Sequence, residues 1–316
     1  MKNIDSSVLA IDRGGVDLTP GVIYAVNESR LASSTYSEPL TAYTVGWKDS
    51  ENIEATLEWI APSIVVGRRF EFKKADNNEQ FFSEIDDIRG IGSDFKRIEY
   101  KGTSVNEKTL NKGLAYRIDS DEDLVSEEVV VARLQTRLLR NELRRAFGVA
   151  QAAASNTNKT WNASATPDED MRAAIAAHQL AMGVFPNRGI ISLAAWNLRC
   201  SAYAPQNNAG ALAGMSRNAT DVGQLLGLDD LRTTRELFQV SGTAKQRILT
   251  SNALFFFGEN GIMKDDPSSV KRFVTRPDGG KFRVYRTQVG KFVDIIVEHY
   301  SNIVAAAGGI QQLTLS

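Results

Sequence analysis

The chain has 316 residues, of which 42% are hydrophobic and 24% charged. This composition excludes disorder of the whole chain and predicts a soluble globular protein with a hydrophobic core. Its 37 basic and 38 acidic residues give a net charge of -1, which disfavours a basic DNA-coating protein and permits dense self-association. Cys200 is the single cysteine, so no internal disulfide can form and a reducing compartment is expected. No signal peptide or apolar run of ~20 residues is found, which predicts a cytosolic protein without a membrane segment.

Residues 1–45 predict an extended arm, because turn formers alternate with short apolar runs and no period persists. Such an arm either lies along a neighbouring surface or is a frayed terminus. Residues 46–66 contain a short amphipathic helix, predicted over 49–59. Its apolar stripe is Ile53, Leu57 and Ile60, and Pro62 ends it.

Residues 67–112 predict a long two-stranded excursion from the body of the protein. Between Arg68 and Lys101 eight basic and eight acidic residues are interleaved with phenylalanine, isoleucine and tyrosine. Alternation at 69–73 and at 95–100 indicates two strands, and residues 76–78 and 90–92 supply turn chemistry.

This excursion needs a partner surface, since an isolated two-stranded ribbon is marginal in water and this one carries aromatic side chains. A balanced mixture of charges suits a second copy of the same chain, each sign meeting its opposite. A solvated extension packed on its own domain fits the composition equally well, and both interpretations stay open at this point.

Residues 113–118 predict a strand, and residues 123–150 predict the longest helix of the chain. The helical segment has no proline and a single late glycine, and it would span roughly 40 Å. Its apolar residues keep one buried stripe: Val131, Leu134, Leu138, Leu143 and Phe147.

The charges of this helix also follow a pattern. Glu127 and Glu128 lie near its predicted start, and Arg137, Arg140 and Arg144 lie towards its predicted end. Carboxylates at the first turn and cations at the last turn stabilise the helix dipole. The helix is therefore interpreted as a rigid spine.

The rest of the chain alternates between helices and strands. A loop and a short strand are expected over 151–166, after which Thr166, Pro167 and Glu169 predict a capping box for a helix that runs to Met182 and ends at Gly183. Buried strands are predicted at 189–193 and 253–257, a strand region at 232–240, and helices at 194–198 and 220–226. Antiparallel strands are expected at 281–286 and 292–297, following a turn at 277–280.

The sequence offers little chemistry. His178 lies inside a predicted helix, and His299 lies at a strand end without a nucleophile beside it. No phosphate-binding loop or dinucleotide motif occurs, and an acidic run at 119–123 lacks the glycine and glutamate of a calcium loop. We therefore predict no catalytic, cofactor-binding or metal site, and no enzyme.

Short sequence motifs occur along the chain in the same order as the predicted segments. They are GRRFEFKKAD at 67–76, KGLAYRID at 112–119, Trp161 followed by TPDED at 166–170, FPN at 185–187, AAW at 194–196 and VGQLLGL at 222–228. In these motifs and their order the chain resembles the tailed-bacteriophage major capsid proteins, which have the Hong Kong 97 fold. The first two motifs are similar to the limbs of that family's extended loop. The later ones are similar to its run into the axial domain.

The resemblance implies an α+β fold of Hong Kong 97 type with six parts. These are an N-terminal arm (1–45), a peripheral-domain entry helix (46–66), an extended loop (67–112), a peripheral domain with the spine helix (113–185, spine 123–150), an axial domain (186–272) and C-terminal peripheral strands (273–316). The loop residues expected to contact a neighbouring copy are Arg68, Arg69, Phe70, Phe72, Lys73, Lys74, Phe81, Phe82, Asp86, Asp87 and Arg89.

The resemblance also implies a function. Copies would form hexamers and pentamers that close an icosahedral head shell around double-stranded DNA, which they contact nonspecifically. The shell would be assembled in the host bacterial cytoplasm and become the capsid of the virion. A scaffold, a portal and decoration proteins would be separate chains, since about 45 residues are too few for a large scaffolding domain.

Two alternatives remain from the sequence. An encapsulin-like nanocompartment would share the fold and enclose a cargo enzyme instead of a genome. A cytosolic α/β enzyme would use residues 184–260 to form a pocket with Asp229, Asp230 and Arg232. A megadalton particle on size exclusion would eliminate the enzyme.

Overall fold

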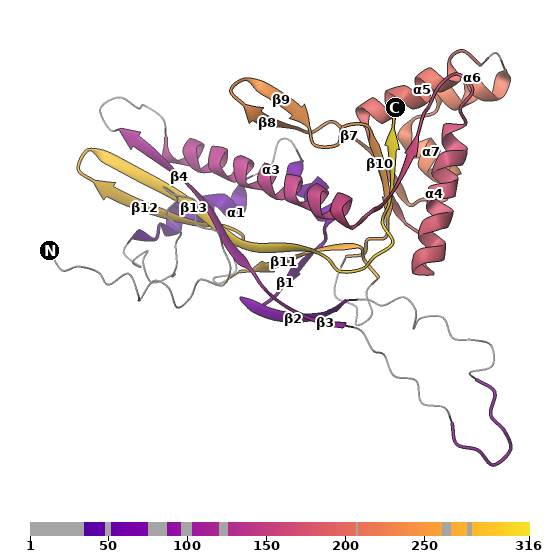
Figure 1. Ribbon diagram of the computed structural model, residues 1–316. Coiled ribbons are helices and arrows are strands. Elements are labelled where there is room, and N and C mark those ends of the chain that lie inside the picture. The colour runs from indigo at the N-terminus through magenta and orange to yellow at the C-terminus, as the bar shows by residue number, and fades with distance from the viewer. Residues whose placement is uncertain are drawn as a thin grey trace.

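The computed structural model describes residues 35–47, 52–74, 87–95, 103–119, 126–206, 208–260, 267–276 and 280–316 (Figure 1). This part of the chain has an α+β fold, as predicted, with two five-stranded sheets that each carry helices and two separate two-stranded ribbons. Residues 1–34 of the arm expected over 1–45 lie outside the described residues.

The first sheet is organised by the 14-residue strand β13 (Phe292–Ala305). Strand β4 (Leu110–Asp119) pairs with one of its edges, while β12 (Arg283–Val289) and then β11 (Val270–Thr275) pair in succession with the other. The short strand β1 (Ser63–Val65) adds to β11 in parallel. The strands predicted at 113–118, 281–286 and 292–297 are thereby confirmed.

Helices α1 (Glu38–Gly46) and α3 (Glu127–Ala153) pack on this sheet, and α2 (Ile53–Ile60) packs on α3. The predicted stripe of α3 is buried in full, because residues three and four apart fall on one side of a helix and meet β13 and α2 there. The predicted stripe of α2 is buried as well.

The second sheet has the order β5 (Ser155–Lys159), β14 (Gln311–Leu315), β10 (Asn252–Phe256), β6 (Arg188–Ser192) and β7 (Asp230–Thr234). All residues of β10 are buried, which confirms the fully apolar strand predicted there. The helices of this unit are α4 (Pro167–Met182), α5 (Leu193–Tyr203), α6 (Ala209–Ser216) and α7 (Ala219–Leu225).

Two two-stranded ribbons are not paired into either sheet. Strand β2 (Arg69–Lys74) pairs with β3 (Thr103–Lys108), and β8 (Leu237–Ser241) pairs with β9 (Ala244–Arg247). The predicted strand at 69–73 is confirmed, but its partner is 103–108 instead of 95–100. Apart from Phe95, residues 95–100 lie outside the described residues.

Several boundaries differ from the prediction. The supposed arm contains α1, where Pro39 stands in the first turn and Leu40 is buried against the core. Thr166 makes no side-chain cap on α4, so the predicted capping box is wrong there. A capping box does form at α7, between Asn218 and Asp221.

Helix α3 ends later than expected, which changes the meaning of its charges. It continues through a run of good helix formers to Ala153, so Arg144 lies nine residues before its end and the last turn has no basic residue. A helix dipole acts on charges within the last turn. The predicted dipole role of Arg137, Arg140 and Arg144 is therefore wrong, whereas Glu127 and Glu128 do lie in the first turn.

The C-terminal strands are shared between both sheets. Strands β12 and β13 belong to the first sheet, but β14 pairs with β5 and β10 in the second. Periodicity predicts a strand but not its partner, so sequence could not place β14. Of the described helices only α3 exceeds 18 residues, and its charges rule it out as a bilayer-spanning segment.

Candidate assembly interface

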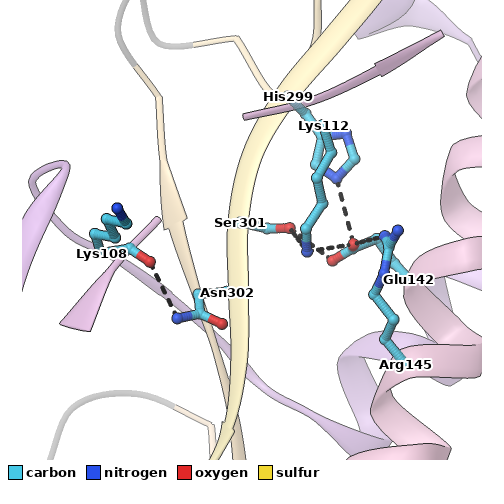
Figure 2. A network of polar contacts seen from close by, with 7 residues as sticks. All are labelled: Lys108, Lys112, Glu142, Arg145, His299, Ser301 and Asn302. Carbon is cyan, nitrogen blue, oxygen red and sulfur yellow. Dashed lines mark hydrogen bonds and ion pairs between the residues drawn. The ribbon is translucent and has the colours of Figure 1, made fainter. Parts of the chain in front are cut away.

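The base of the predicted loop is the β2–β3 ribbon, and it is fixed to the first sheet. Asn302 on β13 donates its side-chain amide to the carbonyl oxygen of Lys108 at 3.0 Å (Figure 2) and to the Glu107 carboxylate at 3.2 Å. The Thr109 hydroxyl lies 2.8 Å from that of Thr275 on β11. The ribbon therefore starts from a rigid platform.

The inner face of the ribbon is apolar. The rings of Phe70 and Phe72 pack on Phe273 of β11, with centroids 4.3 Å and 5.2 Å away, and are half-buried there. This chain therefore supplies a partner surface for both rings, in agreement with the second of the two interpretations, and their expected contact with a neighbouring copy stays a prediction.

The outer face of the ribbon is charged. Arg68, Arg69, Glu71, Lys73 and Lys74 are exposed, so both signs are presented along β2 and its approach. A surface groove of about 730 Å³ follows this ribbon and is lined by Arg69, Phe70, Glu71, Asn106, Glu107 and Lys108.

The described tip of the loop, residues 87–95, is a small folded turn. Arg89 donates Nε to the Ser93 carbonyl oxygen at 2.5 Å and places its guanidinium 4.5 Å from the centre of the Phe95 ring. The Ser93 backbone amide and hydroxyl both donate to the Gly90 carbonyl oxygen, at 3.1 and 2.8 Å. These local bonds fix the turn independently of the two sheets.

The tip presents apolar side chains to solvent. Ile88 is 73% exposed, Phe95 76%, and Ile91 fully exposed. Figure 1 places this turn apart from both sheets, below and to the right of them. Of the remaining predicted loop residues, Asp87 is exposed, whereas Phe81, Phe82 and Asp86 lie outside the described residues.

The strand that returns from the loop, β4, is bonded to the spine helix through the Glu142 cluster, which comprises Lys112, Glu142, Arg145, His299 and Ser301 (Figure 2). Lys112 Nζ lies 2.7 Å and Arg145 Nη1 2.8 Å from Glu142 Oε1, and the Ser301 hydroxyl donates to Oε2 at 2.6 Å. His299 Nε2 lies 3.7 Å from Oε1, beyond hydrogen-bond distance.

The Glu142 side chain is 1% exposed, so its charge depends on these partners. Burial by itself would raise the pKa of Glu142, but the facing His299 and the Lys112 ammonium outweigh it and hold that pKa far below the usual range. Burial also lowers the pKa of Lys112 and of His299, and Glu142 opposes both shifts. The result is an ionic link between α3, β4 and β13.

The residues weighed for catalysis have structural partners. His178 is buried in α4, with Nδ1 2.7 Å from the Gly309 carbonyl oxygen, and burial lowers its pKa. Arg232 donates to Asp230 at 2.6 Å and lies 4.5 Å from the Trp59 ring centre. Within the part of the chain that the structure describes, no group of three or more His, Cys, Asp or Glu is placed to hold a metal ion.

Comparisons with known proteins address the fold. No family model and no curated protein match the chain. A phage-related protein from Bordetella bronchiseptica matches with a TM-score of 0.63 at 14% identity, over 88% of this chain and 96% of that one. The mature capsid of bacteriophage PhiM1 matches at 0.53 and 7% identity (82% and 86% covered), and a virus-like particle from Pyrococcus furiosus at 0.50 and 11% (87% and 98%). The chain therefore has the α+β fold of phage capsid structures.

Sequence reasoning missed the Glu142 cluster. One signal was present: Glu142 falls on the buried stripe of α3, between Leu138 and Ala146. A carboxylate on an apolar helix face implies a buried cation opposite, because an unpaired buried charge is costly. The identity of that cation, Lys112, depends on how β4 pairs with β13 and is not readable from spacing.

Proposed function

We propose that this chain is a structural shell protein and no enzyme, whose copies assemble into hexamers and pentamers that close an icosahedral head around the double-stranded DNA of a tailed bacteriophage. The observation that carries the proposal is the loop tip, whose exposed Ile88, Ile91 and Phe95 belong to a turn held by its own hydrogen bonds. The capsid-type fold supports it. Assembly would take place in the bacterial cytoplasm and yield the capsid of the virion, with scaffold, portal and decoration proteins as separate chains.

The tip gains burial if it enters the surface of a second copy. Each of its large apolar side chains would contribute about 1.5–3 kcal/mol when fully buried, before the entropic cost of association. The charged outer face of β2, with Arg68, Arg69, Lys73 and Lys74, would set the register of that contact through opposite charges on the neighbour. Asp87 and Arg89, and outside the described residues Phe81, Phe82 and Asp86, are proposed for the same contact.

We propose a revised division into domains that follows the two sheets. The peripheral domain would comprise the first sheet with α1, α2 and α3. The axial domain would comprise residues 186–256 with α4 and the strands β5 and β14, which pair into its sheet. The loop would reach from the peripheral domain to the next subunit.

The experiment removes the loop without disturbing its base. Lys74 pairs with Thr103 across the ribbon, so an Asn-Gly turn can replace residues 75–102 and close β2 on β3 as a hairpin. The shortened chain is expected to stay folded by circular dichroism and to form no particles on size exclusion or in negative-stain images. Normal shells from this variant would show that the loop does not join subunits.

A finer variant tests the tip itself. Replacing Ile88 and Ile91 by serine is expected to abolish particle formation while leaving the melting temperature of the subunit unchanged, because both side chains are already in solvent. Leu180→Ser on α4 is the matched control, since Leu180 is 89% exposed and lies outside the loop. Shells should form from the control.

A second candidate function is a nanocompartment shell of encapsulin type, which the likeness to the Pyrococcus furiosus virus-like particle favours. The contents of native particles distinguish the two. Nuclease-resistant double-stranded DNA inside virions agrees with a phage head, whereas protein cargo in a cell-derived shell would overturn it.

A further inference from the structure

The outward face of α3 carries a row of arginines, which we call the arginine stripe: Arg133, Arg137, Arg140 and Arg144. All four are exposed, and their spacings of four, three and four residues place them on one side of the helix, opposite the stripe buried on β13.

The helix itself does not account for the N-terminal half of the stripe, Arg133 and Arg137. Its members lie in the middle of α3, where the helix dipole gives a cation no stabilisation. Successive members repel one another, because like charges three and four residues apart are neighbours on a helix surface. Among the described residues neither Arg133 nor Arg137 forms an ion pair, and the one carboxylate of α3 beyond its first turn, Glu142, is buried on the other side.

The positive surface extends from the helix onto the β8–β9 ribbon. The Arg144 guanidinium lies 4.0 Å from the centre of the Phe238 ring, which packs the ribbon beside the stripe. In Figure 1 α3 lies between this ribbon and the strands β12 and β13. Residues 237–247 contain Lys245 and Arg247 and no carboxylate, so the ribbon adds positive charge.

The stripe fits a linear polyanion better than a protein surface. Arg133 and Arg144 are separated by 11 residues, or roughly 16 Å along a straight helix, and duplex DNA carries a phosphate every ~3.4 Å along each strand. Protein interfaces usually need a buried apolar anchor, and Val129 is the one large apolar side chain exposed on α3. Guanidinium groups bind phosphate oxygens in a bidentate manner.

We infer that the arginine stripe binds the phosphate backbone of double-stranded nucleic acid without regard to sequence. The inference rests on the proposed function in one respect. In a closed shell, the side of α3 that carries the stripe would face the interior of the shell and contact the packaged duplex. The near-zero net charge of the whole chain does not oppose a local surface of this kind, because α3 carries a single carboxylate beyond its first turn.

Binding is measured on the full-length chain before assembly, with a fluorescently labelled 24-base-pair duplex of mixed sequence and anisotropy readout at 50–200 mM NaCl. Three to four phosphate contacts predict an affinity that falls about 40- to 150-fold across this range. The variant R133Q/R137Q should weaken binding at 50 mM NaCl at least tenfold and halve the slope of log affinity against log salt, since each lost contact removes about one from that slope.

The control R172Q/R217Q removes the same charge from the α4–α7 unit and should bind as the wild type does. Equal slopes for wild type and R133Q/R137Q would overturn the inference. So would a variant that binds the duplex normally but fails to form particles, because the stripe would then be a contact between protein subunits.

Negative-stain images of the same proteins separate the two proposals. Wild-type shells without duplex binding by the free chain would refute the stripe and leave the shell function standing. Duplex binding that depends on the stripe, in a chain that never forms particles, would support the stripe and refute the shell.

Discussion

Removing the carboxylate at Glu142 is expected to destabilise the subunit more than any surface change. In Glu142→Leu the Lys112 ammonium, on a side chain that is 12% exposed, loses the carboxylate at 2.7 Å and keeps only the Ser301 hydroxyl oxygen at 3.0 Å, while that hydroxyl loses its own acceptor at 2.6 Å. Breaking a buried ion pair by deleting one member costs about 3–5 kcal/mol. Because burial already lowers the pKa of Lys112, that group can shed its proton, and we expect the lower end, about 3 kcal/mol.

The double variant Lys112→Met with Glu142→Leu tests the cause. It replaces the pair with apolar side chains of similar volume, a change that is often neutral or stabilising. We therefore expect it to be at least about 1 kcal/mol more stable than Glu142→Leu alone, although Arg145 also loses its acceptor.

Urea denaturation of the unassembled chain, followed by circular dichroism and tryptophan fluorescence, gives the free energies of unfolding. Glu169→Gln is the control: this carboxylate is 63% exposed and pairs with Arg172 on the surface, so its loss should cost less than about 1 kcal/mol. If the double variant is destabilised by the sum of the effects of Glu142→Leu and Lys112→Met measured singly, Lys112 and Glu142 are not coupled and the reasoning fails.

Three further outcomes are expected. First, the wild-type free energy of unfolding should fall as the pH drops below about 5. The reason is that Glu142 in the unfolded chain takes up a proton near the ordinary glutamate pKa of 4.5, whereas its pKa in the folded chain is lower. When urea midpoints are measured against pH, the free energy of unfolding of Glu142→Gln should fall less steeply than that of the wild type, by up to ~1.4 kcal/mol per pH unit. Second, Phe273→Ala should cost about 3–5 kcal/mol in the same assay and expose the ribbon base to proteases, since Phe70 loses its stacking partner; an uncleaved ribbon would contradict this. Third, Gly309→Ala should lower the melting temperature, because φ is +81° there and a Cβ would overlap Met182; calorimetry showing no loss would refute that strain.

The sequence was sufficient to predict those helices and strands whose burial is encoded in the spacing of apolar residues along the segment itself. The stripes of α2 and α3 and the apolar run of β10 each signal their burial through spacing alone, and the structure confirms all three. The α+β class was implied by the resemblance to the capsid family. Boundaries were less certain: the predicted helix ends at residue 150, whereas α3 continues to Ala153 because glutamine and alanine are good helix formers.

Pairing between distant segments was beyond sequence reasoning. The partner of β2 is a polar strand, TSVNEK at 103–108, which lacks the alternation that marks a half-buried strand. It forms because β2 offers an edge and Asn302 binds Lys108, and both are tertiary effects. At the loop tip the sequence-based contact residues included Asp87 and Arg89 but missed Ile88, Ile91 and Phe95, because composition does not say which apolar side chains of a charged segment stay exposed.

The structure separates the stability of the subunit from its capacity to associate. The Glu142 cluster holds the returning strand β4 to α3 through a carboxylate that is 1% exposed, so it fixes the base of the loop from within the subunit. Ile88 and Ile91 face solvent, so they contribute nothing to folding and are available for contact with another chain. Changes in the cluster should therefore lower the free energy of unfolding at unchanged affinity between folded subunits, and changes in the tip should do the reverse. A tip variant that unfolds more easily, or a Glu142 variant that folds fully but cannot associate, would show that base and tip act as one unit.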